Sequence, residues 1–329
     1  MLRVLKSPYA LACPGQGFVR YGYLAPFANY MPTLQPYLDQ LDEALNEKFS
    51  QHLLNTDKNT DTQSWIAKTS NAQPAILFTT FILNELIRHE YGIDLAKQAT
   101  YLMGHSLGEY TALLLSGVLD LPSALKLVRK RGQLMESLLP SKDQDQHLYG
   151  MRAYLFPESY FEAVRKIAEE NNVLANLNHQ QQIVCSGHVD ELTKFGDVVR
   201  QNLSDIDIKE VPLEVNIPFH NQRLKPLVSE LEDYVNQNIT LGMQKVPIIS
   251  NLTGRPSSSS ETTLKNTLDD NCRPVQWVSS MQYLQQQGIS TIVNMGPGYV
   301  LKSINSKYSG MTNVALDTPT TFKRLKTNN

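Results

Sequence analysis

The sequence predicts an α/β protein that has a parallel sheet at its core and a small α+β segment inserted into the larger domain. Short apolar strands that run into glycine turns, with helical stretches after them, predict the parallel sheet. A change in element length predicts the insert, because the expected strands and helices become shorter between residues 149 and 213. A chain of 329 residues can bury the core of a large domain with a smaller one beside it.

The first half of the chain supplies the strand–turn–helix pattern. Apolar strands are expected at 9–13 and 100–103. The first strand enters Pro14-Gly15-Gln16-Gly17, a turn in which two glycines can take conformations closed to other residues. Apolar spacing predicts a helix over 74–89, and an amphipathic pattern predicts another over 122–139. A strand, a tight glycine turn and then a helix is the α/β pattern.

The second half begins with a polar loop at 141–146 and continues into the insert, where the expected order is strand, helix, strand, helix, strand. Larger elements then return. They are a helix over 226–235 and strands over 246–250 and 291–295. The serine run 257–260 predicts a flexible loop, and the polar tail from Thr318 predicts poor order.

Composition excludes several classes of protein. The formal net charge is -2, so the basic excess that is typical of duplex-binding proteins is missing. The three cysteines, Cys13, Cys185 and Cys272, are far apart, which predicts small buried side chains and neither a disulfide framework nor a metal site. No apolar run reaches membrane-spanning length, and the first residues lack the apolar core of a signal peptide.

The strongest chemical pattern is the heptad Gly104-His105-Ser106-Leu107-Gly108-Glu109-Tyr110, between an expected strand and an expected helix. A serine with glycines two residues before and after it is typical of a nucleophile elbow, a sharp turn that exposes the hydroxyl group. A side chain at either glycine would collide with the neighbouring strand and helix. The helix start also directs its dipole at negative charge that develops beside Ser106. The competing interpretation is a strand-to-helix turn without catalysis.

A serine hydroxyl needs a general base at neutral pH. Among the seven histidines, His220 is the best candidate, because it lies in a loop-like segment that returns to the large domain after the insert. His105 is adjacent to Ser106, but its side chain should point away from the hydroxyl group. Position alone does not distinguish His220 from an ordinary loop histidine.

Five segments occur in the order in which a known family carries them. They are Pro14-Gly15-Gln16-Gly17, the heptad from Gly104 to Tyr110, Arg131-Gly132-Gln133-Leu134-Met135, Asn176-Leu177-Asn178 and Gly296-Pro297-Gly298. Together they resemble malonyl-CoA:acyl-carrier-protein transacylases, the free-standing enzymes of dissociated fatty-acid synthesis. The similarity covers nearly the whole chain. The segment from Pro218 to Asn221 resembles the fungal mitochondrial members most.

The resemblance implies a fold. A hydrolase-like major domain with a parallel sheet core is expected from residues 1–148 and 214–329, and a small ferredoxin-like α+β subdomain from residues 149–213. It also implies transfer of a malonyl group from malonyl-CoA to the phosphopantetheine thiol of an acyl carrier protein through a serine-linked acyl-enzyme. No metal or redox cofactor is implied. A monomer in the mitochondrial matrix is expected, with the cytoplasm as the alternative location.

The resemblance also implies roles for single residues. Ser106 matches the nucleophile, and His220 matches the general base. The backbone N–H groups of Gln16 and Leu107 match the oxyanion hole. Arg131 matches the guanidinium that binds the malonyl carboxylate, because its planar fork can hold a carboxylate bidentately. Without the resemblance, Arg131 would be interpreted as a solvated helix charge among other basic residues.

Weaker assignments concern positions around the base. In the family a backbone carbonyl orients the histidine, and the matching position is Asp270, whereas Glu109 is expected to be a helix-start carboxylate. Phe219 replaces a small residue of the bacterial enzymes, and its ring would crowd a branched methylmalonyl group. Arg152 also stands where a small residue is usual. A basic rim that would help an acidic carrier to dock is expected from Lys126, Arg129, Lys130 and Lys302.

Two other functions stay open at this point. A serine hydrolase built on the same elbow would have an acidic partner for the histidine and no need for a carboxylate-binding arginine. A carrier-protein-binding module that has lost activity would fail to acylate Ser106. The intact Ser106 and His220 favour an active enzyme.

Overall fold

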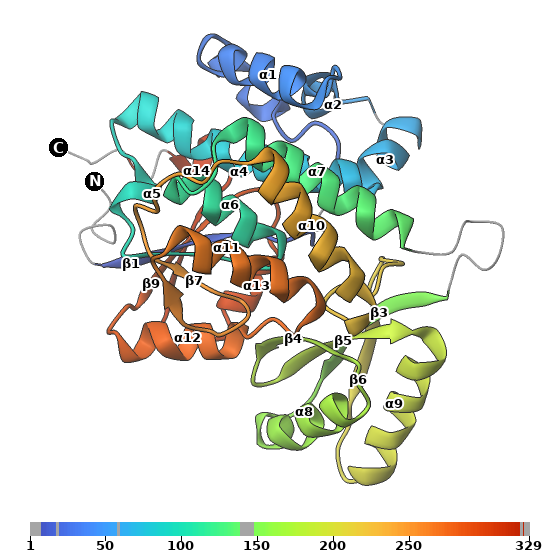
Figure 1. Ribbon diagram of the computed structural model, residues 1–329. Helices are drawn as coiled ribbons and strands as arrows, with labels where there is room; N and C mark the ends of the chain where they lie inside the picture. The colour runs from blue at the N-terminus through green and yellow to red at the C-terminus, as the bar shows by residue number, and fades with distance from the viewer. Residues whose placement is uncertain (1–7, 18–19, 58–59, 139–147, 323–324, 326–329) are drawn as a thin grey trace.

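The computed structural model describes residues 8–17, 20–57, 60–138, 148–322 and 325. The expected loop at 141–146 lies outside these residues. Two sheets organise the chain: the larger one lies among most of the helices, and the smaller one lies beneath it in Figure 1. In the described part of the chain, none of the helices is both long and apolar enough to cross a membrane.

The larger sheet has the strand order β10-β9-β1-β2-β7-β8. Its strands are β1 (Tyr9–Cys13), β2 (Tyr101–Gly104), β7 (Ile248–Ile249), β8 (Pro256–Ser257), β9 (Thr291–Met295) and β10 (Thr312–Leu316). All neighbours pair in parallel except β7 and β8. Strands β1 and β9 are buried on both faces, as expected for a parallel sheet covered by helices. The parallel sheet that the sequence predicts is confirmed.

The helices of the larger domain cover both faces of this sheet or pack on the helices that do. They are α1 (Met31–Leu45), α2 (Ser50–Leu54), α3 (Thr60–Ala67), α4 (Thr69–Tyr91), α5 (Leu95–Gln98), α6 (Leu107–Ser116), α7 (Leu121–Ser137), α10 (Lys225–Asn238), α11 (Ser260–Asp269), α12 (Trp277–Gln286), α13 (Val300–Asn305) and α14 (Pro319–Phe322). Alternate residues of β1 divide the core: Leu11 packs in the cluster that contains α4, α6 and α7, whereas Ala10 packs in the cluster that contains α12. The core therefore lies on both sides of the strand that leads to the site.

The smaller sheet belongs to a ferredoxin-like subdomain. Its elements run β3 (Tyr149–Leu155), α8 (Phe161–Glu170), β4 (Leu174–His179), β5 (Gln182–His188), α9 (Val189–Asn202) and β6 (Lys209–Pro212). The strand order is β4-β5-β3-β6, with antiparallel pairing throughout. The expected order omitted one strand, β4, because its polar residues Asn176, Asn178 and His179 are buried although no alternation of apolar residues marks them.

Two expectations of disorder are wrong for the described residues. The serine run does not form a flexible loop: Ser257 ends β8, the Ser259 side chain caps α11, and Ser260 begins that helix. In the tail, Phe322 of α14 and Leu325 are buried, and the Phe322 ring contacts Phe27. The three cysteines are free and buried, as predicted.

A backbone seam joins the small sheet to the segment that precedes α12. Val275 donates its N–H to Ala175 O (2.9 Å) and accepts from Leu177 N (3.0 Å), so this segment is paired with β4. The 3-10 helix η5 (Asp270–Cys272) lies just before this seam. The seam therefore sits immediately beside the segment that contains the predicted partner of the base.

Candidate active site

Ser106 lies at the turn between β2 and α6 in a backbone conformation that is rare for a side-chain-bearing residue, with φ 52° and ψ -109°. Such strain persists where the surroundings fix it, and it is common at active sites. Here Asn251 Oδ1 accepts a hydrogen bond from Ser106 N (2.7 Å), and Asn251 Nδ2 donates to Gly104 O. Sequence reasoning missed Asn251, because its contacts join residues that are far apart in the chain.

The glycines of the elbow are required by space. A Cβ at Gly104 would lie 1.9 Å from Gly108 C, and a Cβ at Gly108 would lie 2.1 Å from Cys13 O. This is the collision expected from the heptad. The earlier turn differs from expectation, because neither Gly15 nor Gly17 has a positive φ. A Cβ at Gly15 would instead lie 2.6 Å from His105 O, so close packing against the elbow explains that glycine.

Replacing Gly108 by alanine is expected to destabilise the protein by about 3 kcal/mol or more, because the carbonyl of a central strand would have to move. Urea unfolding measures this change. Gly150→Ala is the matched control, since the nearest atom to its added Cβ is 3.6 Å away. We expect that control to change the free energy of unfolding by less than about 1 kcal/mol. Equal losses in both variants would contradict the packing argument.

His220 is brought onto Ser106 from 114 residues away in the chain, with Nε2 2.7 Å from Ser106 Oγ. Its Nδ1 lies 2.9 Å from Asp270 O and 3.2 Å from Arg273 O. Carbonyl oxygens only accept, so Nδ1 carries the proton and Nε2 is left to accept from the serine hydroxyl. The geometry suits a general base. His105 is directed elsewhere, with Nε2 3.0 Å from Asn178 Oδ1.

Burial and the nearby Arg131 charge lower the pKa of His220 to about 3, so the imidazole is neutral at physiological pH. Because a neutral imidazole is needed to accept the serine proton, we expect acylation of Ser106 to stay near its full rate well below the ordinary histidine pKa of about 6.5. The rate of acylation by acetyl-CoA between about pH 4.5 and 8 measures this, since that donor carries no carboxylate of its own. A half-maximal rate near pH 6.5 would contradict the shift.

Two buried carboxyl groups lie near this pair. Asp270 Oδ2 is 3.5 Å from His220 Nδ1, farther than the Asp270 carbonyl. Burial, then the neighbouring Glu109, raises the pKa of Asp270 well above its usual range, whereas the nearby Arg131 charge lowers it. Glu109 lies in the first turn of α6 as expected, but it is fully buried, and burial raises its pKa to about 8. Asn251 N donates to Glu109 Oε2 (3.2 Å).

Arg131 is buried, with 3% of its surface exposed, which excludes the solvated helix charge. Its Nη1 donates to Gln73 Oε1 (2.9 Å), and its Nη2 lies 3.4 Å from Ser106 Oγ. Arg129, two residues earlier on α7, is turned away and pairs with Glu47 (2.8 Å), so it is not a free rim charge. The structure thus places one guanidinium of this basic stretch beside the serine.

The two expected oxyanion positions, Gln16 and Leu107, come from different parts of the chain. Leu107 is the first residue of α6, where a backbone N–H has no partner inside its helix. Gln16 lines the pocket that contains Ser106. Within the described part of the chain, no hydrogen bond uses the backbone N–H of Gln16 or of Leu107.

The pocket around Ser106 has a volume of about 150 Å³ and lies between the two sheets. His220, Arg131 and Phe219 line it together with Ser106, and Met151 comes from the small sheet. Arg152, the next residue along, is directed elsewhere in an ion pair with Glu210, which accounts for a large residue at that position.

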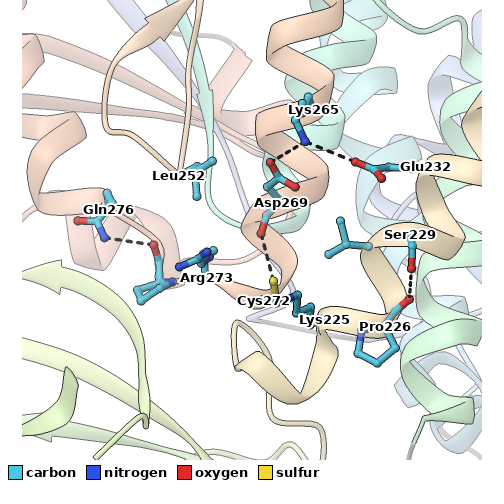
Figure 2. Close-up of a pocket in the computed structure, with 12 residues that line it drawn as sticks. Lys225, Pro226, Ser229, Glu232, Leu252, Lys265, Asp269, Cys272, Arg273 and Gln276 are labelled. Atoms are coloured by element: carbon cyan, nitrogen blue, oxygen red, sulfur yellow. Dashed lines mark hydrogen bonds and ion pairs between the residues drawn. The ribbon is translucent and has the colours of Figure 1, made fainter. Parts of the chain in front are cut away.

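A larger groove of about 840 Å³ lies between α10 and α11 and contains none of the predicted site residues (Figure 2). Lys265 closes one part of it by pairing with Asp269 (3.1 Å) and Glu232 (3.5 Å). Cys272 and Arg273 form its wall. These residues belong to the segment whose carbonyls face His220, so the groove lies behind the base rather than in front of the serine.

A serine that is hydrogen-bonded to a neutral histidine is suited to chemistry through a serine ester, and the family match makes the protein an acyltransferase. The model of the acyl transferase domain matches residues 13–307. The chain belongs to this family and, within it, to the malonyl CoA-acyl carrier protein transacylases.

Similar proteins cover nearly the whole chain. The malonyl CoA-acyl carrier protein transacylase of Bacillus subtilis (strain 168) is 30% identical over 321 residues, which are 96% of each chain. That of Staphylococcus aureus (strain MRSA252) is 29% identical over 309 residues, 92% of each chain. Both relatives are bacterial, so the nearer resemblance to fungal mitochondrial members stays a prediction.

Solved structures show the same fold. An acyl carrier protein S-malonyltransferase from Vibrio cholerae superposes with a TM-score of 0.84 at 26% identity, covering 97% of this chain and 100% of that one. FabD from Acinetobacter baumannii gives a TM-score of 0.81 at 26% identity and 96% coverage of both. A malonyl-transacylase in complex with its type II PKS acyl-carrier protein gives 0.84 at 24% identity, covering 98% of this chain and 100% of that one.

Proposed function

We propose that this chain transfers a malonyl group from malonyl-CoA to the phosphopantetheine thiol of an acyl carrier protein. The observation that carries the proposal is the buried Arg131 guanidinium 3.4 Å from the Ser106 hydroxyl. A buried cation beside a nucleophile suits an acyl group that ends in a carboxylate, because that carboxylate would otherwise be desolvated without a partner. The names of the relatives and the carrier-protein complex support the same substrate and partner.

In the first half of the proposed cycle, His220 Nε2 takes the proton of Ser106 Oγ as that oxygen attacks the thioester carbonyl. The backbone N–H groups of Gln16 and Leu107 receive the tetrahedral oxyanion, a contribution of about 3 kcal/mol per donor. The C–S bond then breaks, and the coenzyme A sulfur takes the proton from His220. Malonyl remains as an ester on Ser106 while free coenzyme A leaves.

In the second half, the pantetheine thiol gives its proton to His220 and attacks the ester, and the proton returns to Ser106 Oγ as the ester bond breaks. Phe219 at the pocket wall would crowd a branched malonyl donor.

We further propose that the chain acts as a monomer without a metal or redox cofactor, in the mitochondrial matrix, with the cytoplasm as the alternative. Lys126 and Lys302 are exposed and remain candidates for a docking rim.

A serine hydrolase is the second candidate, because the Asp270 carboxyl group lies 3.5 Å from His220 Nδ1. Incubation with malonyl-CoA and a phosphopantetheinylated acyl carrier protein separates the two. Malonyl-carrier that forms faster than free malonate supports the transferase. Malonate that accumulates without malonyl-carrier would establish the hydrolase. A chain that yields neither product and no adduct would be a binding module.

A further inference from the structure

Arg131 is held by a side chain that the sequence did not single out. Asn271 Oδ1 accepts a hydrogen bond from Arg131 Nε at 2.7 Å. Both residues are buried, and Asn271 has 1% of its surface exposed. Asn271 is the middle residue of η5, and its neighbours Cys272 and Arg273 line the groove of Figure 2. Asn271 itself does not line this groove, and its side-chain amide faces the Arg131 guanidinium beside Ser106.

The orientation of this amide is fixed by its other bonds. Asn271 Nδ2 donates to Leu268 O (2.8 Å) and to Tyr110 Oη (2.9 Å). Because the Leu268 carbonyl can only accept, the amino group must face it, and Oδ1 is left to face Arg131. The Tyr110 ring lies beneath the same guanidinium, 5.0 Å from its Cζ. Asn271 and Tyr110 thus hold Arg131 from two sides.

The hydrogen bonds of Arg131 decide how an anion can approach it. A guanidinium has five N–H donors. The single N–H of Nε is taken by Asn271, and one N–H of Nη1 is taken by Gln73. The donors that remain are on Nη1 and Nη2, and Nη2 lies 3.4 Å from Ser106 Oγ. A carboxylate can therefore be received by the two terminal nitrogens, next to the nucleophile.

We propose that Asn271 is a positioning residue for substrate specificity: it fixes the rotation of Arg131 so that both terminal nitrogens receive the carboxylate of the acyl group. This inference rests on the proposed malonyl transfer. A guanidinium without its Nε partner can rotate, and the carboxylate then loses alignment with a thioester carbonyl at Ser106. A donor without a carboxylate, such as acetyl-CoA, makes no use of Arg131 and should be indifferent to Asn271.

The test compares acylation of the wild type and of Asn271→Leu, a change of similar volume, by malonyl-CoA and by acetyl-CoA. Intact-protein mass after rapid quenching gives kcat/KM for each donor. We expect the value for malonyl-CoA to fall about tenfold and that for acetyl-CoA to stay within about twofold, as for loss of one hydrogen bond to a charged group. Asn84→Leu is the control: Asn84 is also buried and bonded, to Ala96 N, but lies on α4 away from the pocket. In this control, the ratio of kcat/KM for malonyl-CoA to kcat/KM for acetyl-CoA should equal that of the wild type.

Tyr110→Phe provides an independent variant, because it keeps the ring beneath Arg131 and removes the hydroxyl partner of Asn271. We expect a fall of about threefold in the same ratio. If Asn271→Leu fails to fold, this variant decides the question. An unchanged ratio in the soluble variants, or equal losses with both donors, would overturn the role of Asn271. A wild type that forms no malonyl adduct would overturn the proposed function instead, so the two failures are distinguishable.

Discussion

Ser106→Ala is expected to abolish the malonyl adduct and to lower kcat/KM for malonyl transfer by at least about 10⁴-fold. Ser106 Oγ is the hydroxyl that lies 2.7 Å from the neutral His220 Nε2, in a turn whose strained backbone holds it at the pocket. Without Oγ the thioester has no nucleophile of this kind. Intact-protein mass after brief incubation with malonyl-CoA, followed by a carrier-transfer assay, measures both effects.

The control for this variant is Ser116→Ala at the other end of α6. Ser116 is also fully buried, but its hydroxyl donates to Leu113 O (3.1 Å) and does not reach the pocket. We expect an unchanged adduct in this control. A malonyl adduct on Ser106→Ala at the rate of the wild type would place the nucleophile elsewhere and contradict the site.

Arg131→Leu is expected to lower kcat/KM for malonyl-CoA by about 100-fold and to change that for acetyl-CoA far less. The carboxylate of the malonyl group would enter a buried pocket and find no cation, so it would lose its solvent without compensation. Removing the charge also removes one of the two main causes that lower the pKa of His220, so the acidic limit of activity should move toward higher pH. The same mass measurement with both donors tests the first effect.

Arg129→Leu is the matched control, because it removes a guanidinium two residues away on the same helix. Arg129 pairs with Glu47 and donates to Ser70 O and Asn71 rather than facing the pocket, so its loss should cost about 2 kcal/mol or more of stability and leave the donor ratio unchanged. Equal losses with malonyl-CoA and acetyl-CoA in Arg131→Leu would show a structural effect and not recognition of the carboxylate.

The elbow could be predicted from the sequence because its cause is local. Gly104 and Gly108 are needed for close approach, and that need leaves a fixed spacing around Ser106. The parallel sheet was predictable for a similar reason, since strands buried on both faces are continuous apolar runs such as β1. Where a single local cause dictates the residue type, the pattern is visible in one chain.

Other parts of the site have no local cause. The contact of His220 with Ser106 joins residues far apart in the chain, so spacing alone does not predict it, and the assignment depends on the family resemblance. Asp270 contributes a carbonyl, which any residue could supply. Asn251 acts through a hydrogen bond to the backbone of Ser106, and Asn271 acts through a hydrogen bond to the Arg131 guanidinium. A polar residue of this kind looks the same in a sequence whether it faces water or the core.

The seam between Val275 and β4 consists of backbone hydrogen bonds to Ala175 and Leu177. Such bonds do not depend on which side chains the paired residues carry. The insert can therefore diverge in sequence, or be exchanged for that of a relative, while its junction with the catalytic domain is retained. Chimeras that graft a foreign insert onto this chain should keep the contact between Ser106 and His220, provided that a strand still pairs at this seam.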